Sequence, residues 1–370
     1  GGIYAGAQFL RDVNNTDNFS MYCVMDSKAT KEKLPELLKL QKTIIQDTIF
    51  TNKERLQQII MESKSRKEMR MMSAGHATAL TRAASYHNPM SHLQEIYSGL
   101  DYYRFITNLE NNFDENYEKI VEKLNVMMHK VFNANNLIVS VTCDEADLPL
   151  VEKSIPAMVQ TLYTDVSPVQ DLEFKQDIKN EGLMAPTNVQ YAGLYGNLKD
   201  KGYKHCGCMN VMSNVLRNEF LYNQIRVQGG AYGAMFSIDR TGTINFASYR
   251  DPNLGKTYDV YKGCGEFLRN FKCSDRDLAK YIIGAVSPLD NPITPAQVGG
   301  ISMSRYLSGV TEEIVQRERE ELIDTKVSDI NACGDIIDAV VKDNIICTFG
   351  NSAKIQEEKD IFKNLVNIFE

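Results

Sequence analysis

The chain has 370 residues, which is enough for two domains that each bury a core. Hydrophobic residues make up 43% and charged residues 24%, as in ordinary globular proteins. The net charge of -7 argues against a nucleic-acid partner or an anionic membrane surface. No apolar run approaches the length of a membrane span, so we expect no membrane partner.

Alternation and helical spacing predict the first elements of the chain. Residues 1–9 and 18–25 are typical of two antiparallel strands joined by an Asn-rich turn. Apolar residues then recur at helical spacing from about 31 to 50, which predicts an amphipathic helix. Thr51 and Glu54 fit a capping box and therefore predict the start of a second helix.

The same order of patterns returns in the second half of the chain. A loss of loop residues after the duplication of one ancestral unit would leave such a repeat, so we expect a duplicated α+β unit. The matching segments are residues 1–6 with 229–234, 51–54 with 274–277, 98–100 with 308–310, and 136–140 with 344–348.

Charged residues with Pro168 and Gly182 among them indicate a linker between the two copies. We therefore expect a first domain at residues 1–166, a linker at 167–185 and a second domain at 186–370. This division assigns the Gly-Gly strand of each copy to a separate domain.

The two copies begin differently. The second has a strand at about 188–192 and a helix at about 206–223 ahead of its Gly-Gly strand, whereas the first starts directly at that strand. The opening strand and helix of the first copy were either lost or are supplied by upstream residues. Because residue 1 is not Met, we expect the chain to be a fragment of a longer polypeptide.

The eight cysteines are scattered, which is typical of reduced thiols in a reducing compartment. Cys206 and Cys208 are close, but a single intervening residue differs from the Cys-x-x-Cys pair of zinc sites. We interpret them as two small helix-packing residues. His205 precedes them, but neighbours on a helix point apart and cannot all reach one tetrahedral ion.

The stretch QIRVQGGAYGA, residues 224–234, places Arg226 and Tyr232 six positions apart across the corner where a loop enters a strand. Alone, this pattern is typical of a surface Arg and a half-buried Tyr at the start of a strand. Both side chains are hydrogen-bond donors that suit a carbonyl or oxyanion better than a phosphate or metal. The sequence SYRDPNL follows at 248–254.

This ordered pair of motifs closely resembles the C-terminal half of presequence proteases, which are pitrilysin-type (inverted-motif) zinc metallopeptidases. The order of elements agrees over essentially the whole chain. The resemblance implies two similar domains, each a mainly antiparallel sheet with helices packed on one face. Residues 1–166 would be the third domain of the full-length protease and residues 186–370 the fourth.

The resemblance also implies a function for the chain. It would be the non-zinc half of a metalloendopeptidase that degrades unstructured peptides inside a clamshell chamber. Its partners would be the N-terminal half of the same polypeptide and unfolded peptide substrates. Tyr232 would stabilise the oxyanion, and Arg226 would bind a neighbouring substrate carbonyl, so both are the expected catalytic and substrate-binding residues.

The family holds its zinc with a His-x-x-Glu-His motif. The nearest match here begins at His92 and has Ile96 in place of the second His. We therefore expect zinc only in the N-terminal half of the full-length enzyme, no metal residue in this chain, and no activity of the chain alone. A bacterial cytoplasm is the expected location, with the mitochondrial matrix as an alternative.

Other functions remain open. A non-catalytic peptide-binding or structural subunit of the same fold would also lack the zinc motif, although it would have no need of Arg226 and Tyr232. A nucleotide site at 228–233 is disfavoured because its glycines precede a strand, whereas phosphate loops precede a helix. Four aromatic residues on nearby strands could pack in the core or line the chamber: Tyr191, Tyr195, Phe236 and Tyr249.

Overall fold

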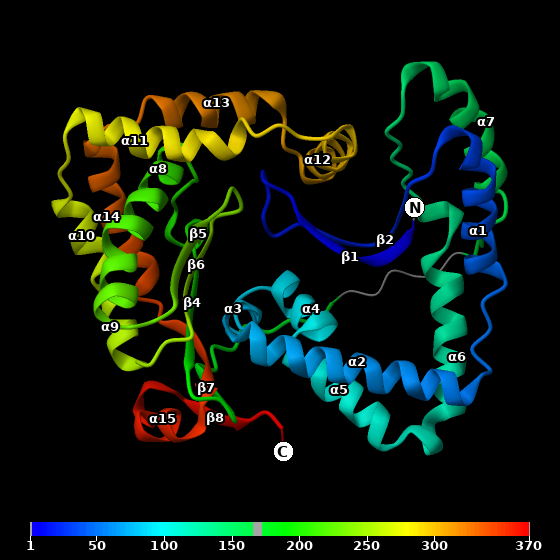
Figure 1. Ribbon diagram of the computed structural model, residues 1–370, viewed down its shortest axis with the longest axis horizontal. Helices are drawn as coiled ribbons and strands as arrows, with labels where there is room; N and C mark the ends of the chain where they lie inside the picture. The colour runs from blue at the N-terminus through cyan, green and yellow to red at the C-terminus, as the bar shows by residue number, and fades with distance from the viewer. Residues whose placement is uncertain (1, 166–171, 370) are drawn as a thin grey trace.

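The computed structural model describes residues 2–165, here called the first half, and residues 172–369, the second half. Within these residues it contains a two-stranded and a six-stranded sheet (Figure 1), and the predicted α+β class is confirmed. The small sheet pairs β1 (Ile3–Arg11) with β2 (Phe19–Ser27), as predicted. The large sheet has the order β5-β6-β4-β7-β3-β8, with β3 (Glu181–Ala185), β4 (Gln190–Asn197), β5 (Gly233–Ile238), β6 (Thr243–Tyr249), β7 (Ile345–Asn351) and β8 (Asn364–Asn367).

Helices surround both sheets. Those of the first half are α1 (Leu34–Gln46), α2 (Lys53–Ser73), α3 (Gly75–Ser85), α4 (Pro89–Ser98), α5 (Leu100–Asn111), α6 (Phe113–Val131) and α7 (Leu148–Val159). Those of the second half are α8 (Cys208–Val215), the π-helix η5 (Leu216–Gln228), α9 (Gly255–Lys262), α10 (Cys264–Asn270), α11 (Asp275–Val286), α12 (Pro295–Ser308), α13 (Glu312–Ile323), α14 (Val327–Val341) and α15 (Ser352–Glu357). The short 3₁₀ turns are η1 (Lys31–Lys33), η2 (Ala134–Asn136), η3 (Glu145–Asp147), η4 (Lys199–Lys201), η6 (Ser287–Leu289) and η7 (Lys359–Ile361). No helix in the described ranges has the length and apolar character needed to cross a membrane.

The helix-start signals in the sequence are only partly correct. Helix α11 begins as its pattern predicts, because the Ser274 side chain accepts a hydrogen bond from the Asp277 backbone N–H. Helix α2 begins one residue later than predicted, since the side chain of Asn52 rather than Thr51 accepts from the Arg55 N–H, at 2.9 Å. An Asn caps a helix as well as a Thr does, so both residues were competent.

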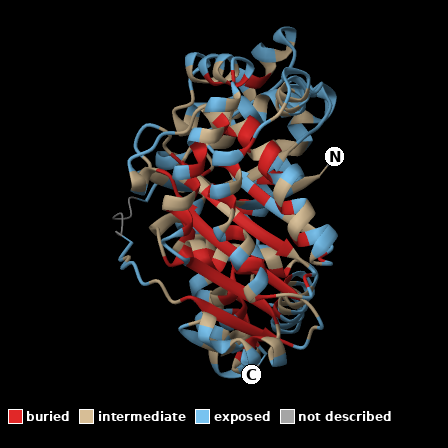
Figure 2. Ribbon diagram, turned by 90° about the vertical axis from the view of Figure 1, so that its left-hand side faces the viewer, coloured by how far each residue is buried: buried red, intermediate tan, exposed pale blue. Residues whose placement is uncertain are grey.

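The large sheet is covered on both faces. Strands β5, β6, β4 and β7 run antiparallel to their neighbours, whereas β3 is parallel to β7 and β8. Helices α8, α9, α10 and α14 of the second half pack on one face, and α3 of the first half covers the other (Figure 1). Figure 2 shows the central strands as a nearly continuous block of buried residues.

The expected linker contains part of this sheet. Residues 181–185 form β3, which is buried throughout and paired on both sides. Residues 172–180 have no regular structure, and residues 167–171 of the expected linker lie outside the described residues. The Arg82 side chain of α3 reaches β3, where it donates to both carboxylate oxygens of Glu181 at 2.5 and 3.2 Å. The two halves therefore share one buried core and one ion-pair network.

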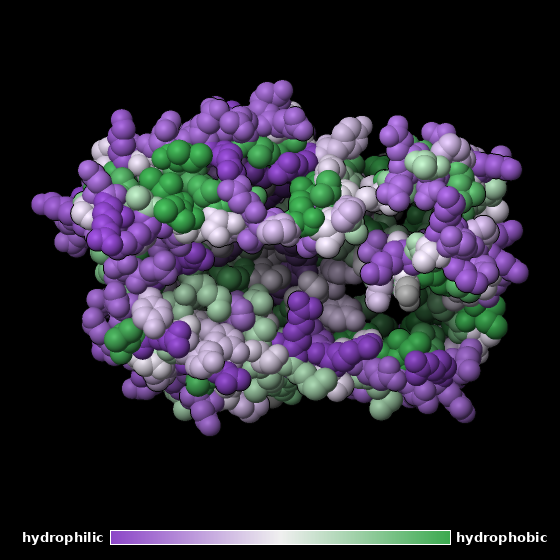
Figure 3. Space-filling model, turned by 45° about the horizontal axis from the view of Figure 1, so that its top comes forward, coloured by the Kyte–Doolittle hydropathy of each residue, from purple (hydrophilic) through white to green (hydrophobic). Residues whose placement is uncertain are grey.

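The first half has fewer strands than the second. Residues 137–144, whose sequence matches the start of β7, form neither helix nor strand, and their side chains are exposed. The region containing α1, α6 and α7 is hollowed, with apolar side chains around the openings (Figure 3). The duplicated sequence pattern thus corresponds to two sheets of very different completeness.

Candidate functional site

Arg226 lies on a helix rather than in the expected loop. Helices α8 and η5 follow each other without a break from Cys208 to Gln228, past the predicted end near residue 223. The buried side chains of Leu221 and Ile225 hold this extension against the core, which explains why it continues. It ends at Gly230, whose φ of 79° is readily adopted by glycine.

Tyr232 occupies the position just before β5. Its backbone N–H donates to the carbonyl oxygen of Tyr249 at 3.0 Å, which extends the pairing of β5 with β6 by one residue. The two rings lie 5.9 Å apart, centre to centre. The Tyr232 side chain is nevertheless 66% exposed. Its backbone is therefore fixed while its phenol stays accessible.

The structure brings Arg226 and Tyr232 together. The guanidinium carbon of Arg226 lies 5.7 Å from the centre of the Tyr232 ring and 5.2 Å from that of Tyr222, both typical of cation–π contacts. Within residues 2–165 and 172–369, Arg226 pairs with no carboxylate and the Tyr232 hydroxyl makes no hydrogen bond. Two adjacent exposed donors are thus left without protein acceptors in the described chain.

The SYRDPNL motif holds the glycine turn between them. The Asn253 side-chain amide donates to the carbonyl oxygen of Gly229 at 2.6 Å. The buried Asp251 carboxylate accepts from the Asn253 N–H at 2.9 Å and from the Thr257 hydroxyl at 2.7 Å. Our sequence reasoning missed these positioning residues. The Asp-Pro-Asn run was the available signal, because such runs form turns stabilised by side chains.

Three of the four aromatic residues that could have lined a chamber belong to the core. Tyr191, Tyr195 and Phe236 are each at most 3% exposed. Tyr249 is partly exposed, and its hydroxyl donates to the carbonyl oxygen of Ser73 at 3.1 Å. Of the four, Tyr249 remains a candidate for contact with a ligand near Tyr232.

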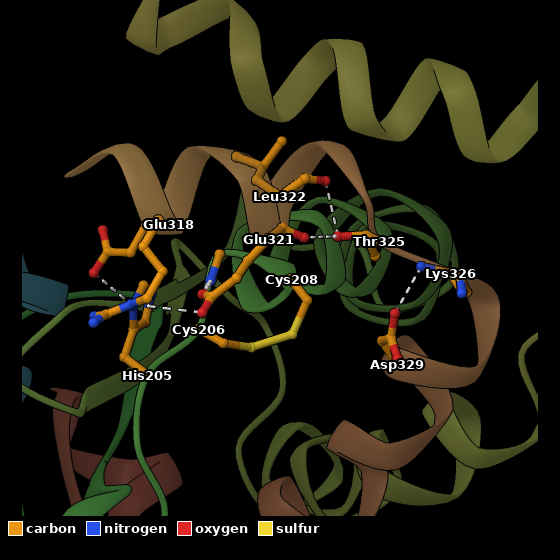
Figure 4. Close-up of a disulfide and its surroundings, with 11 residues drawn as sticks. His205, Cys206, Cys208, Glu318, Glu321, Leu322, Thr325, Lys326 and Asp329 are labelled. Atoms are coloured by element: carbon orange, nitrogen blue, oxygen red, sulfur yellow. Dashed lines mark hydrogen bonds and ion pairs between the residues drawn. A yellow bond between two sulfur atoms is a disulfide. The ribbon is translucent and has the colours of Figure 1, made fainter. Parts of the chain in front are cut away.

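Cys206 and Cys208 are joined in a disulfide at the start of α8 (Figure 4), so their interpretation as two reduced helix-packing residues is wrong. The turn at Gly207 brings their Cα atoms to 5.4 Å, within the usual range for a disulfide. The remaining cysteines are free: Cys23, Cys143, Cys264, Cys273, Cys333 and Cys347.

The histidines discussed as metal ligands have other contacts. His92 lies in the first turns of α4 with its ring 5.7 Å from that of Phe174. His205 Nδ1 lies 3.4 Å from a carboxylate oxygen of Glu318. Across the described residues, no three His, Cys, Asp or Glu side chains are grouped as a metal site requires.

Family models match both halves of the chain. The model described as PreP C-terminal domain matches residues 180–349. A second model, for the region associated with subfamily C of the M16 peptidases, matches residues 1–109. The first match includes Arg226, Tyr232 and the SYRDPNL motif. The second includes the β1–β2 ribbon and the helices up to α5.

Curated relatives agree with these matches. Protein HypA of Clostridium perfringens is 32% identical over 368 residues, covering 100% of this chain and 38% of the relative. Presequence protease 1, chloroplastic/mitochondrial, of Arabidopsis thaliana is 34% identical over 319 residues, covering 86% of this chain and 30% of that protein. The chain therefore spans about a third of the length of these relatives.

Solved structures show the same fold. Pitrilysin superposes with a TM-score of 0.58 at 12% identity, over 93% of this chain and 35% of pitrilysin. The inactive domain of an M16 peptidase from Pseudomonas fluorescens gives 0.56 at 14% identity, over 94% of this chain and 81% of that one. The fold is thus that of an M16, or pitrilysin-type, peptidase. Within that class the chain belongs to the presequence-protease-like family and corresponds to its C-terminal half.

Proposed function

We propose that this chain is the non-zinc half of a metalloendopeptidase and that it supplies Arg226 and Tyr232 to the reacting peptide. The observation that carries the proposal is the pair itself: an exposed guanidinium and an exposed phenol in contact, without acceptors in the described chain. A pair of donors that served only the fold would normally be hydrogen-bonded within it.

The two side chains suit different oxygens of a peptide substrate. Attack of water on a peptide carbonyl builds negative charge on its oxygen, and the Tyr232 hydroxyl donates to that oxygen. Arg226 binds a neighbouring substrate carbonyl and holds the peptide in register. Zinc, bound by the N-terminal half, supplies the Lewis acid of the reaction.

The Gly229–Gly230 turn preorganises this pair. Asn253 fixes Gly229 and the β6 backbone fixes Tyr232, so little reorganisation is needed when charge develops. Such preorganised donors typically contribute about 10²–10³ in rate, or roughly 3–4 kcal/mol.

The proposed substrates are unstructured peptides of limited length, bound as extended chains between this half and the N-terminal half of the same polypeptide. Backbone hydrogen bonding of extended chains tolerates many sequences. We place the protein in a bacterial cytoplasm or a mitochondrial matrix. The free cysteines and the presequence-protease relatives support a compartment of this kind.

The test is Tyr232→Phe in the full-length protein, with a quenched unstructured peptide as substrate. We expect kcat to fall by about 10²–10³ while KM changes little, because the hydroxyl acts mainly in the transition state. Tyr306→Phe is the matched control, since Tyr306 is 84% exposed on α12 and far from the motif in sequence. A kcat within twofold of wild type for Tyr232→Phe would overturn the role.

A second measurement separates the peptidase from a non-catalytic subunit. The full-length protein should contain zinc and lose activity with a chelator, and the present chain alone should be inert. A full-length protein that binds unstructured peptides without hydrolysing them would assign the chain to a binding or structural subunit instead.

A further inference from the structure

The Cys206-Gly207-Cys208 turn differs from every other cysteine site in the described chain. Its two sulfurs are bonded across a single intervening residue, and both cysteines are partly exposed. By contrast, Cys264, Cys333 and Cys347 are buried, and burial raises the pKa of each of these thiols. A buried thiol of this kind reacts slowly, because the thiolate is the reactive form.

The turn is held in place by α13 rather than by its sulfurs. The Gly207 backbone N–H donates to the Glu321 side chain at 2.7 Å, and Figure 4 shows that side chain directed toward the turn. A Cβ atom added at Gly207 would lie 1.8 Å from the carbonyl oxygen of Glu318, so the turn packs directly against the α13 backbone. These contacts do not involve either sulfur and therefore do not require the disulfide.

We propose that Cys206 and Cys208 form an exchangeable disulfide, a redox-modification site that dithiols reduce and disulfide oxidants restore in the folded protein. Because α13 holds the turn, the two sulfurs stay close after reduction, and the high effective concentration favours reclosure. Because the closed loop is so short, the bond constrains the unfolded chain little and adds little stability.

The exchange is a two-electron reaction with a dithiol as reductant. A thiolate of the dithiol attacks Cys206, the Cys206–Cys208 bond breaks, and a mixed disulfide forms while Cys208 leaves as a thiolate and takes up a proton. Cys208 is the expected leaving group because it is the first residue of α8, where the helix N-terminus favours negative charge. The second thiol then attacks the mixed disulfide, and Cys206 departs as a thiol once protonated. The reductant is released as a cyclic disulfide.

The test uses the full chain and maleimide labelling of thiols read by peptide mass spectrometry. After treatment with oxidised dithiothreitol, the peptide with Cys206 and Cys208 should stay unlabelled in denaturant while the other six cysteines are labelled. After incubation with excess reduced dithiothreitol without denaturant, both cysteines should become labelled. The circular dichroism spectrum should be unchanged, and Tm should shift by less than about 4 °C.

Two variants make the result specific. Cys273→Ser removes a partly exposed free cysteine and should leave the labelling of the pair unchanged. Cys206→Ser should leave Cys208 labelled under all conditions. Labelling of both cysteines after the oxidant would show that no such disulfide forms. A pair that resists reduced dithiothreitol until urea unfolds the chain would show a structural bond. Either result would overturn the proposal.

Discussion

Two segments of similar sequence have opposite environments. Residues 344–348 begin β7, where Ile345, Ile346 and Cys347 are at most 3% exposed. Residues 136–140 repeat the pattern, yet Leu137, Ile138 and Val139 are 38–51% exposed and form no strand. Local sequence therefore specifies the capacity to form a strand, and the neighbouring strands determine whether one forms.

The neighbours account for the difference. Strand β7 lies between β4 and β3, both of which precede the Gly-Gly strand of the second half. No described segment of the first half takes the place of β4 beside β2. Strand propensity depends strongly on cross-strand packing, so residues 137–144 stay unpaired despite their β-branched side chains.

The largest expected effect concerns the link between the two halves. Arg82 is 4% exposed and contacts Glu181 of β3 and Glu95 of α4. Arg82→Met would leave two buried carboxylates without their partner, so we expect the free energy of unfolding to fall by about 3–5 kcal/mol. Urea denaturation measures it, and residues of both halves should lose amide protection together.

Arg55→Met is the control for this change. Arg55 forms an exposed ion pair with Glu62 at 3.3 Å, so its loss should cost less than about 1 kcal/mol. A similar small loss in Arg82→Met would mean that the halves are joined by apolar packing alone.

A matched pair of truncations tests the two repeated segments directly. Ile346→Ala removes a side chain that is 1% exposed in β7, and we expect unfolding to become easier by about 2–5 kcal/mol. Ile138→Ala changes the equivalent residue, which is 51% exposed, and should alter stability by less than about 0.5 kcal/mol. Equal losses in the two variants would contradict the difference in burial.

The sequence predicted the elements that local patterns determine. The β1–β2 ribbon, helix α1 and the Ser274 cap follow from alternation, helical spacing and side-chain capping. The number of strands in each sheet could not be predicted, because it depends on pairing between distant residues. The position of β3 within the expected linker could not be predicted for the same reason, since Glu181 is fixed by Arg82 and by two parallel strands.

Of the site, the sequence predicted the two side chains but not their support. The spacing of Arg226 and Tyr232 was visible, whereas the length of η5 was not, because buried Ile225 rather than a local stop signal determines where that helix ends. The Asn253–Gly229 bond joins residues 24 positions apart and has no signal beyond the turn sequence itself. The roles of Arg226 and Tyr232 in catalysis stay predictions.

The smallest expected effect concerns His76 at the start of α3, which links the first half to the strand carrying Tyr249. Its ring lies 5.2 Å from that of Tyr249, and burial lowers the pKa of His76 below its usual value of about 6.5. The unfolded chain therefore binds this proton more readily, so the associated stability is present above about pH 6.5 and decreases as pH falls toward the folded-state pKa. In His76→Gln, urea denaturation at about pH 5 and about pH 7.5 should show a smaller difference in stability than in wild type. Replacing the more exposed His129 in the same way provides the control, and an unchanged pH dependence in His76→Gln would show that this ring is protonated equally well in the folded chain.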